Sequence, residues 1–302
     1  MTTARVFAPA KINLTLHVTG RRADGYHLLD SLVAFAPVGD HLELSDGNTL
    51  SLTVEGPEAQ GVPADMDNLA LRAADLVRLG RGTTITLTKN LPAASGIGGG
   101  SADAAASVRA ALMLEDDAGS EILALGPEIL VDTRLRPLLG LGADIPMCLL
   151  PAPLRARGIG EKITFHPLPP LPAVLVNPRR MVPTGAVFAA LKGRDNPPMP
   201  ETLPDFADAG ALIGWLATQR NDLEAPAIEV APVIADVLSI LSQTEGCQLA
   251  RMSGSGATCF GLYPDEEQAR AAAAWLGTAH PDWWVAGGVL GDMSGRAMPQ
   301  IS

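Results

Sequence analysis

The part of this 302-residue chain best suited to chemistry is a run of glycines in front of a predicted helix. Four glycines lie within the five positions from Gly96 to Gly100, and Ser101 then opens an alanine-rich stretch. Glycine lets the backbone bend freely and lets a ligand approach its N–H groups. The start of a helix adds unpaired N–H donors and a partial positive charge. We therefore favour a phosphate-binding loop over the alternative, a flexible turn capped by Ser101.

Two other phosphate motifs do not match this run. A Walker A loop needs Gly-Lys-Ser/Thr, and no lysine follows these glycines. The dinucleotide fingerprint needs a third glycine three residues after Gly98, where Ser101 stands, so a Rossmann dehydrogenase is disfavoured. Phosphate binding here would depend on main-chain N–H groups.

A second group of polar residues lies near the N-terminus on a predicted strand. Alternation places Lys11, Asn13 and Thr15 on one polar face of that strand. Ile12 and Leu14 then face the core. A lone lysine on a strand is usually solvated surface, so Lys11 gains weight only beside other segments.

A third segment runs from Gly20 to His27 and contains Asp24-Gly25, a turn signal. Tyr26 and His27 follow that turn. A flat ring beside a hydrogen-bonding imidazole can hold a planar base. The alternative is a surface hairpin whose ring covers a neighbouring strand, and the residues alone leave both open.

Two further segments carry single polar groups. Asp144 lies between an apolar helix end and Pro146, where an ordinary turn aspartate is the default and a carboxylate aimed at a substrate hydroxyl is the alternative. Ser253 to Thr258 is glycine-rich and lies between two predicted strands. It is either a plain hairpin, which we favour on its own merits, or a second wall of the anion site.

The first half of the chain must supply the elements that position these groups. Alternation from Ile12 to Val18 predicts one half-buried strand. A helix is expected from Leu69, capped by Asp67 or Asn68 and ended by Gly80. The other expected elements are strands at Leu42–Leu44, Leu50–Val54 and Thr83–Lys89 and a helix from Ser101 to about Leu114.

The second half follows a single supersecondary pattern. Pro151 to Pro172 holds six prolines and predicts a domain transition, with a short strand near Ile163, and Gly193 to Pro204 predicts an exposed loop. With one extra helix, the order is β-α-β-β-α-β, the split βαβ arrangement. Its expected strands are 173–176, 248–252, 258–262 and 284–290, and its expected helices are 184–191, 234–241 and 266–276.

Length and composition limit the classes of protein. The length predicts about two domains, and 47% apolar with 18% charged residues is typical of a globular chain. A net charge of -11 argues against nucleic-acid and anionic-membrane partners. Three scattered cysteines predict no disulfide framework or zinc site and favour a reducing compartment. No signal peptide or membrane helix is expected, so we predict a cytoplasmic protein.

Together, these segments in this order resemble the GHMP small-molecule kinases. The glycine-serine loop and the late Gly-Ser-Gly loop match the phosphate-site motifs of that superfamily. The N-terminal pair of segments resembles its branch that acts on a cytidylyl methylerythritol in the non-mevalonate isoprenoid pathway. The matching segments are Pro9–Leu14, Gly20–His27, Gly142–Pro146, Asn221–Glu224 and Met252–Ala257.

The resemblance implies an α+β fold of two domains with the active site between them. Residues 1–160 would form an N-terminal, ATP-binding domain like ribosomal protein S5 domain 2. Residues 161–302 would form a C-terminal domain with the ferredoxin-like split βαβ arrangement. The match is weakest from Asp116 to Leu141. The sequence leaves monomer and homodimer open.

The resemblance also implies transfer of the ATP γ-phosphoryl group to the 2-hydroxyl of that substrate. Asp144 would be the catalytic base and Lys11 its partner. The expected ATP-binding residues are Asp67 and Asn68 near the adenine and Pro92, Ala93, Ala94, Ser95, Gly96, Ile97, Gly98, Gly99, Gly100 and Ser101 around the phosphates. The expected substrate-binding residues are Tyr26, His27 and Phe188 at the cytosine, Asn13 at the methylerythritol group, and Asp144, Thr184, Gly254 and Ser255.

Magnesium is expected to arrive mostly with ATP, and Ser101 and Asp103 are the only nearby protein ligands that the sequence offers, with neither assigned. Two rival functions stay open at this point. One is another GHMP kinase acting on a different small alcohol. The other is an RNA- or ribosome-associated protein, which would need a basic stripe with interleaved aromatics that this acidic chain lacks.

Overall fold

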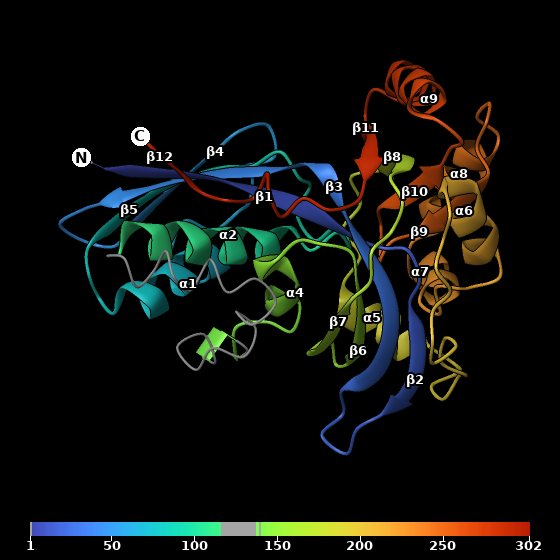
Figure 1. The fold of residues 1–302 in the computed structure, drawn as a ribbon, viewed down its shortest axis with the longest axis horizontal. Coiled ribbons are helices and arrows are strands. Elements are labelled where there is room, and N and C mark those ends of the chain that lie inside the picture. The colour runs from blue at the N-terminus through green and yellow to red at the C-terminus, as the bar shows by residue number, and fades with distance from the viewer. Residues whose placement is uncertain (1, 116–136, 139) are drawn as a thin grey trace.

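The computed structural model describes residues 2–115, 137–138 and 140–302. The weakly matching stretch 116–141 therefore lies mostly outside the described residues. Two sheets lie beside each other, with α1 and α2 on the first and α9 and α8 on the second (Figure 1). Both chain ends lie at the far edge of the first sheet, where the last strand pairs with the first.

The first sheet belongs mainly to the N-terminal half. Its helices are α1 (Leu69–Arg78), α2 (Gly99–Leu114) and α4 (Ile145–Leu149). Its strands are β1 (Thr3–Asn13), β2 (His17–Arg21), β3 (His27–Asp46), β4 (Ser51–Glu55), β5 (Thr83–Thr88), β6 (Leu154–Gly158), β7 (Lys162–Phe165) and β12 (Gln300–Ile301).

The long strand β3 organises this sheet. One end of β3 pairs with β1 and β5, and the other end pairs with β2 and β6. Figure 1 shows β3 running from the outer part of the sheet to the lower middle of the molecule, where it forms a hairpin with β2. The tip of this hairpin projects at the bottom of the view, and Tyr26, which lies in it, is exposed.

The second sheet confirms the predicted split βαβ arrangement. Its order is β11-β8-β10-β9, with every neighbouring pair antiparallel. Two helices, α6 and α7, were not predicted from the sequence. The elements are β8 (Leu171–Asn177), α5 (Thr184–Ala190), α6 (Ala209–Ala217), α7 (Glu224–Val230), α8 (Val233–Ser242), β9 (Leu249–Met252), β10 (Cys259–Leu262), α9 (Glu266–Ala279) and β11 (Trp284–Leu290).

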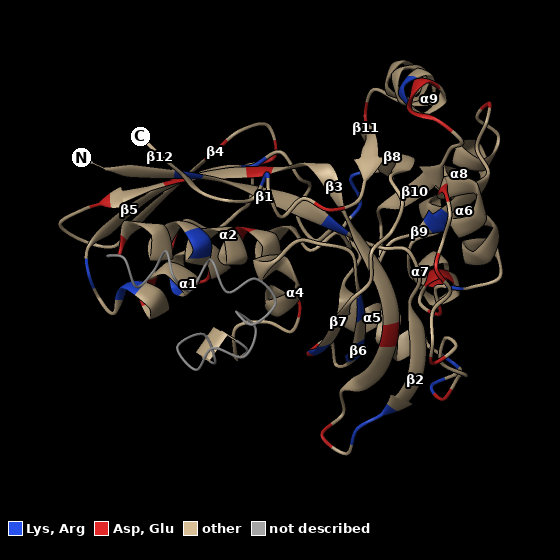
Figure 2. Cartoon of the chain, viewed as in Figure 1, with Lys and Arg blue, Asp and Glu red and all other residues tan. Residues whose placement is uncertain are grey.

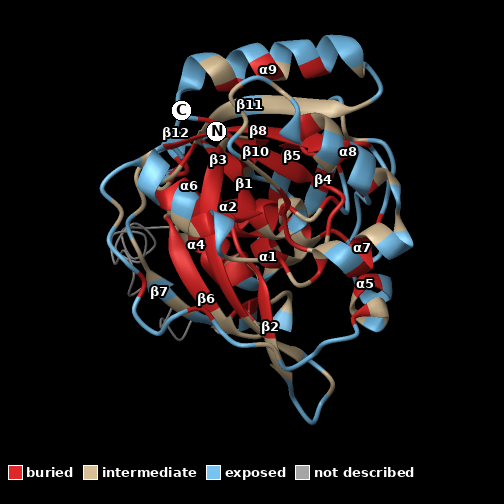
Figure 3. Cartoon of the chain, turned by 90° about the vertical axis from the view of Figure 1, so that its right-hand side faces the viewer, coloured by how far each residue is buried: buried red, intermediate tan, exposed pale blue. Residues whose placement is uncertain are grey.

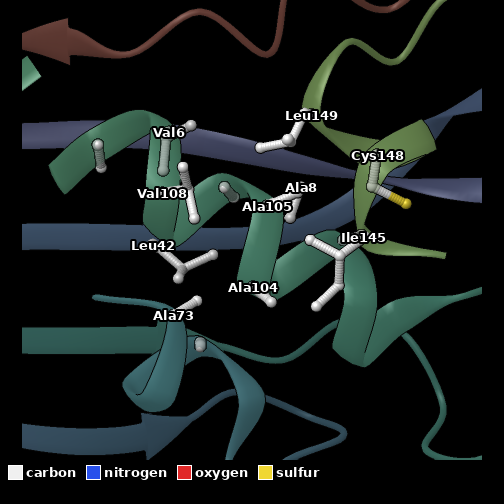
Figure 4. Packing of buried hydrophobic residues seen from close by; sticks show 14 of the residues in the cluster. Val6, Ala8, Leu42, Ala73, Ala104, Ala105, Val108, Ile145, Cys148 and Leu149 are labelled. Carbon is white, nitrogen blue, oxygen red and sulfur yellow. The ribbon is translucent and has the colours of Figure 1, made fainter. Parts of the chain in front are cut away.

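Small side chains let α2 lie close to its neighbours. Its alanines are buried on nearly all sides and contact Val6 and Ala8 of β1 and Ala73 of α1 (Figure 4). A helix that is apolar all round belongs in a core, and close packing makes its position sensitive to every methyl group. The glycine segment therefore leads into a helix that cannot easily shift.

A shared apolar core joins the two sheets. Ile12 and Leu32 of the first sheet belong to the same cluster as Leu175 and Phe260 of the second. Burial of each such side chain stabilises the folded state by about 1.5–3 kcal/mol relative to leaving it exposed. Figure 3 shows the strands mostly buried, whereas α9 exposes most of its surface. The common core fixes the two halves against each other and so fixes any site between them.

The prediction of one continuous strand from Ile12 to Val18 is wrong. The chain leaves β1 after Asn13 and joins β2 at His17. In between, the Thr15 hydroxyl accepts the N–H of Leu32 at 2.8 Å, so a side chain takes the place of a backbone partner. The alternating pattern does not show this exchange because the apolar residues stay buried on both sides of the break.

The expected solvated face of that strand is buried instead. Lys11, Asn13 and Thr15 are each at most 5% exposed. Ser253 and Met199 of the second half contact Asn13 and Thr15, whereas Gly98 and Asp144 of the first half lie against Lys11. Polar residues buried in this way need partners, and those partners define the site described below.

The proline-rich stretch Pro151–Pro172 is not a linker between the sheets. It contains β6 and β7, which complete the first sheet beside β3. The loop from Gly193 to Pro204 has no helix or strand, as predicted, but Met199 and Leu203 within it are buried. The division of the chain at residue 160 stays a prediction, and β7 and β12 lie beyond it in sequence.

Charge is dispersed over the surface. Asp and Glu occur on both halves of the molecule and do not gather on one (Figure 2). Among the described residues, no helix has both the length and the apolar character needed to span a bilayer.

Candidate active site

A cavity of about 1050 Å³ lies between the two halves. The first half lines it with β1, the β2–β3 hairpin, the glycine segment and the start of α4. The second half adds α5 and the loop between β9 and β10. Segments that are far apart in sequence thus share one space.

In the cavity wall, Lys11 contacts Asp144. Lys11 Nζ lies 2.9 Å from Asp144 Oδ2. The lysine side chain is 6% exposed, whereas the aspartate side chain is 38% exposed. A buried cation therefore holds one oxygen of a carboxylate that remains open to the cavity.

The helix that carries Asp144 is anchored from behind. Asp144 is the residue just before α4, and Arg109 of α2 donates to the carbonyls of Cys148 and Phe7 at 2.6 and 3.0 Å. Burial raises the pKa of the Cys148 thiol to about 12, so this thiol stays protonated near neutral pH. Asp144 is thus held by α2, the same helix that follows the glycine segment.

The glycine segment presents an open helix end to the same cavity. Gly98 precedes α2 with φ of 68°, in the left-handed region that favours glycine, and no side chain caps the helix. The first N–H groups of a helix have no partner within it. Gly98, Gly99, Gly100 and Ser101 line the cavity, so these donors face its space.

The late Gly-Ser-Gly loop is both a hairpin and a second wall. It joins β9 to β10, and its residues Gly254 and Ser255 line the cavity. A Cβ at Gly96 would lie 2.6 Å from the carbonyl oxygens of Gly256 and Ser253. Only glycine permits this approach of two backbones, which explains why both loops are rich in it.

The Asn221–Glu224 segment holds that loop in place. Asn221 Nδ2 donates to the carbonyls of Met252 and Gly254 at 2.8 and 2.9 Å. Glu224 Oε2 accepts the N–H of Met252 at 2.8 Å. This matched motif positions the loop and does not line the cavity with its polar atoms.

The β2–β3 hairpin and α5 together bring an aromatic pair to the cavity. The His27 ring stacks on Phe188 of α5, with centroids 4.6 Å apart and planes 16° apart. Tyr26 is 61% exposed. Burial, together with Arg21 and Arg194, lowers the pKa of His27 below its ordinary 6.5. A neutral imidazole with a hydrogen-bonding edge therefore faces the cavity at neutral pH.

Most of the predicted site residues meet in this cavity. Those that line it are Lys11, Asn13, Tyr26, His27, Ala94, Ser95, Gly96, Gly98, Gly99, Gly100, Ser101, Asp144, Thr184, Phe188, Gly254 and Ser255. Those outside its lining are Asp67, Asn68, Pro92, Ala93 and Ile97. The cavity geometry brings residues together, and their roles stay predictions.

The residues outside the lining have structural contacts. Ile97 is fully buried in the core shared by the two sheets. Asn68 caps α1 by accepting the N–H of Ala70 at 2.9 Å. Leu69, the next residue, lines the cavity, so Asp67 and Asn68 lie at its margin.

A second lysine cluster lies beneath the glycine segment. Lys89 Nζ contacts Asp40 Oδ2 and lies 2.7 Å from Asp103 Oδ2. Asp103 is 3% exposed and does not line the cavity. Asp103 is thus no ready magnesium ligand, whereas Ser101 lines the cavity. Among the described residues, no group of three or more His, Cys, Asp or Glu side chains could hold a metal.

Sequence reasoning missed several residues of the site. Ser31, Arg21 and Arg194 line the cavity, and Lys89 supports the glycine segment from below. Arg21 lies within the matched segment Gly20–His27, so the sequence could have indicated it as a site residue. Ser31 and Lys89 lie on or beside ordinary strands, and only the folded arrangement shows what they contact.

Comparison with known proteins agrees with this geometry. Residues 68–150 match the GHMP kinases N terminal domain, and residues 199–280 match the GHMP kinases C terminal model. A Dinoroseobacter shibae protein named 4-diphosphocytidyl-2-C-methyl-D-erythritol kinase is 55% identical over 285 residues, 94% of each chain. The chain belongs to the GHMP kinase family.

Two more comparisons extend this family assignment. A Paracoccus denitrificans protein of the same name is 56% identical and covers 93% of this GHMP kinase and 95% of its own chain. A crystal structure of 4-(cytidine 5'-diphospho)-2C-methyl-D-erythritol kinase matches with a TM-score of 0.69 and 33% identity, over 95% of this chain and 99% of that chain. The predicted fold class and the predicted family are therefore confirmed.

Proposed function

We propose that this GHMP kinase transfers the γ-phosphoryl group of ATP to the 2-hydroxyl of 4-diphosphocytidyl-2-C-methyl-D-erythritol, in non-mevalonate isoprenoid precursor synthesis. The observation that carries the proposal is the 2.9 Å contact of Lys11 with Asp144 in the cavity that also holds the open end of α2. The names of its relatives support the choice of substrate.

Asp144 is the base of the proposed reaction. Its Oδ2 is held by Lys11, and Oδ1 has no hydrogen-bond partner among the described residues. The hydroxyl oxygen of the substrate attacks the γ-phosphorus while its proton passes to this carboxylate. The bond from the γ-phosphorus to the bridging oxygen breaks, and ADP leaves. Lys11 offsets the negative charge on the attacking oxygen.

The ATP phosphates lie at the start of α2 in this proposal. The unpaired N–H groups of Gly99, Gly100 and Ser101 bind phosphate oxygens, helped by the partial positive charge of the helix end. Phosphoryl transfer depends mainly on positioning and charge stabilisation. The adenine then lies toward Asp67 and Asn68, at the margin of the cavity.

The cytosine of the substrate lies at the His27–Phe188 pair. A neutral His27 offers one donor and one acceptor to the edge of a planar base, and Phe188 offers a stacking face. Among the described residues, His27 Nε2 is buried without a partner. Asn13, Thr184, Gly254 and Ser255 complete the space between cytosine and reacting hydroxyl.

Magnesium fits this cavity only as an ion that comes with ATP. Asp24 and Asp144 are the carboxylates of the described lining, and Lys11 already holds one oxygen of Asp144. Mg²⁺ keeps several waters and is commonly bound through substrate phosphates. When bound, it would neutralise charge on the phosphates, and the Ser101 hydroxyl in the cavity lining could be one of its ligands.

The remaining expectations stay predictions. They are a cytoplasmic location, a monomer or homodimer, and no nucleic-acid partner. The acidic net charge of -11 supports the last of these.

ADP release by the purified protein tests the proposed function. The alcohol panel comprises the cytidylyl methylerythritol, mevalonate and homoserine. We expect turnover with the first alone, and inhibition by CMP that competes with the alcohol and not with ATP. Equal turnover of mevalonate or homoserine would overturn the choice of substrate. Absence of CMP competition would overturn the placement of cytosine at His27.

A further inference from the structure

Ser31 of β3 lines the cavity and is 2% exposed, yet it belongs to none of the matched segments. Its hydroxyl donates to the Thr15 carbonyl at an oxygen–oxygen distance of 2.5 Å. The same oxygen accepts from Asn13 Nδ2 at 2.7 Å. Ser31 therefore connects the break after β1 to a residue of the candidate site.

These two contacts determine which way the Asn13 amide points. A serine hydroxyl has one hydrogen, and here it is committed to a carbonyl that can only accept. Ser31 must therefore accept from Asn13, so Asn13 turns its NH₂ group toward Ser31 and its oxygen the other way. That oxygen accepts from Lys11 Nζ at 2.9 Å.

Asn13 in turn determines how the Lys11 ammonium is used. An ammonium has three donors and no acceptor. One donor goes to Asn13 and one to Asp144, and no third acceptor for it lies within hydrogen-bond distance among the described residues. If the amide of Asn13 were reversed, its NH₂ group would meet Lys11 donor against donor.

We propose that Ser31 is a positioning residue for phosphoryl transfer: by fixing the Asn13 amide, it aims Lys11 at Asp144 and leaves one ammonium donor for the substrate. This inference rests on the proposed roles of Lys11 and Asp144. The hydroxyl of Ser31 acts through Asn13 and not by touching the reacting atoms.

The kinetic test compares Ser31→Ala with Ser31→Thr, which keeps the hydroxyl. Loss of one neutral hydrogen bond and rotation of Asn13 should lower kcat about tenfold in Ser31→Ala. The KM for ATP should stay within about twofold, because α2 is untouched. Ser31→Thr should keep a kcat near that of the unaltered enzyme. An unchanged kcat in folded Ser31→Ala would overturn the proposal.

A direct substrate contact by Ser31 predicts a different result. In that case, Ser31→Ala would raise the KM for the alcohol and leave kcat unchanged, which would also overturn the proposal. If Ser31→Ala does not fold, Ser31→Cys takes its place, because a thiol has nearly the same shape but hydrogen-bonds weakly. The same fall in kcat is then expected.

Nuclear magnetic resonance of protein with ¹⁵N-labelled asparagine tests the amide orientation without any substrate. The side-chain NH₂ signals of Asn13 should shift and exchange faster with water in Ser31→Ala, and should be retained in Ser31→Thr. Identical signals in all three proteins would overturn the proposal that Ser31 fixes the Asn13 amide. If the unaltered enzyme fails to turn over the cytidylyl substrate, the proposed function fails. The NH₂ signals still show whether Ser31 orients the Asn13 amide.

Discussion

Two buried lysines flank the glycine segment, and both contact carboxylates, but only one group opens into the cavity. Lys11 contacts Asp144, whose side chain is 38% exposed. Lys89 contacts Asp40 and Asp103, whose side chains are 0% and 4% exposed. The same pair of residue types thus occurs once in a place that a substrate can reach and once in a place that is sealed.

The two lysines lie on either side of neighbouring glycines. A Cβ at Gly98 would lie 3.2 Å from Lys11 Cε, and a Cβ at Gly99 would lie 3.6 Å from Lys89 Nζ. The segment therefore runs between a cation that faces the cavity and a cation that does not. Exposure of the carboxylate, and not the presence of a lysine–carboxylate pair, distinguishes the proposed catalytic pair from the structural one.

The sealed cluster ties together both ends of the glycine segment. Asp40 Oδ1 accepts the N–H groups of Asn90 and Leu91 at 2.6 and 2.9 Å, a few residues before the segment begins. Asp103 lies in the first turns of α2, where the segment ends, and Lys89 bridges the two carboxylates. Because these side chains are buried and do not line the cavity, the cluster stabilises the segment but cannot serve a substrate.

The largest expected effect is on the open pair. Asp144→Asn removes the proton acceptor and should lower turnover by about 10²–10⁴-fold, the usual contribution of general base catalysis. ATP affinity should change little, because the N–H groups of α2 are unaffected. ADP release and calorimetric titration with ATP measure the two quantities.

Asp24→Asn is the matched control for this substitution. Asp24 is the other carboxylate in the described lining, and it pairs with Arg22 at 2.7 Å on the hairpin, away from Lys11. Turnover of Asp24→Asn should stay within about fivefold, the size of a lost exposed ion pair. Near-normal turnover of Asp144→Asn would show that the open carboxylate is not the base.

The next prediction concerns the two lysines, whose replacements should rank in opposite order by loss of stability and by loss of turnover. Lys89→Met leaves two buried carboxyl groups without a cation and should lower the free energy of unfolding by about 3–5 kcal/mol. Lys11→Met should cost less stability, because the half-exposed Asp144 can be solvated again, but it should lower turnover more. Urea denaturation measures the stability of both variants, and ADP release measures their turnover. An effect of Lys11→Met on stability alone would make both lysines structural.

The sequence was a good guide to the open pair because its residues lie in short segments with distinctive order. Asp144 between Ala143 and Pro146, and Lys11 before Asn13, are matched by their neighbours in the chain. The cavity brings both to one wall, as the resemblance implied. Alternation and capping residues likewise predicted most strands and helices within a few positions.

The sealed cluster and the relay at Ser31 could not be predicted in the same way. Asp40 and Lys89 are 49 residues apart, and each lies on or beside a strand where a charged residue usually faces water. The break after β1 was also hidden, because Thr15 replaces a backbone partner without disturbing the apolar pattern. Periodicity reports which face is apolar, but not what covers the other face.

A smaller effect is expected where the segment touches the open lysine. Gly98→Ala puts a Cβ against Lys11 at a φ of 68° and should cost about 1–2 kcal/mol of stability through backbone strain. The shift of the loop should also weaken ATP binding about tenfold, as one lost hydrogen bond would. Gly80→Ala is the control, since its φ is 80° and nothing lies within 4 Å of its Cβ. It should lose stability alone, and equal ATP affinity in both variants would contradict the proposed phosphate site.

The smallest expected effect is on how the stability cost of replacing Asp103, in the sealed cluster, depends on pH. Burial raises the pKa of Asp103 well above its ordinary 3.8, although Lys89 opposes the shift. The folded protein therefore binds a proton at Asp103 more tightly than the unfolded chain does, so the contribution of this group to stability falls as pH rises. Asp103→Asn resembles the protonated form and lacks this loss. Relative to the unaltered protein, its cost in unfolding free energy should shrink as pH rises from 4 to 7.

Asp40→Asn gives the matched comparison for that measurement. Asp40 Oδ1 holds two backbone N–H groups, and its other oxygen contacts Lys89, so its charged form has partners throughout. Replacing it should cost more unfolding free energy than replacing Asp103 at neutral pH, because Asp40 has more hydrogen-bond partners to lose. Urea denaturation of both variants at pH 4, 5, 6 and 7 measures the difference. A cost of Asp103→Asn that stays constant from pH 4 to 7 would show that burial does not disfavour the charged form of Asp103.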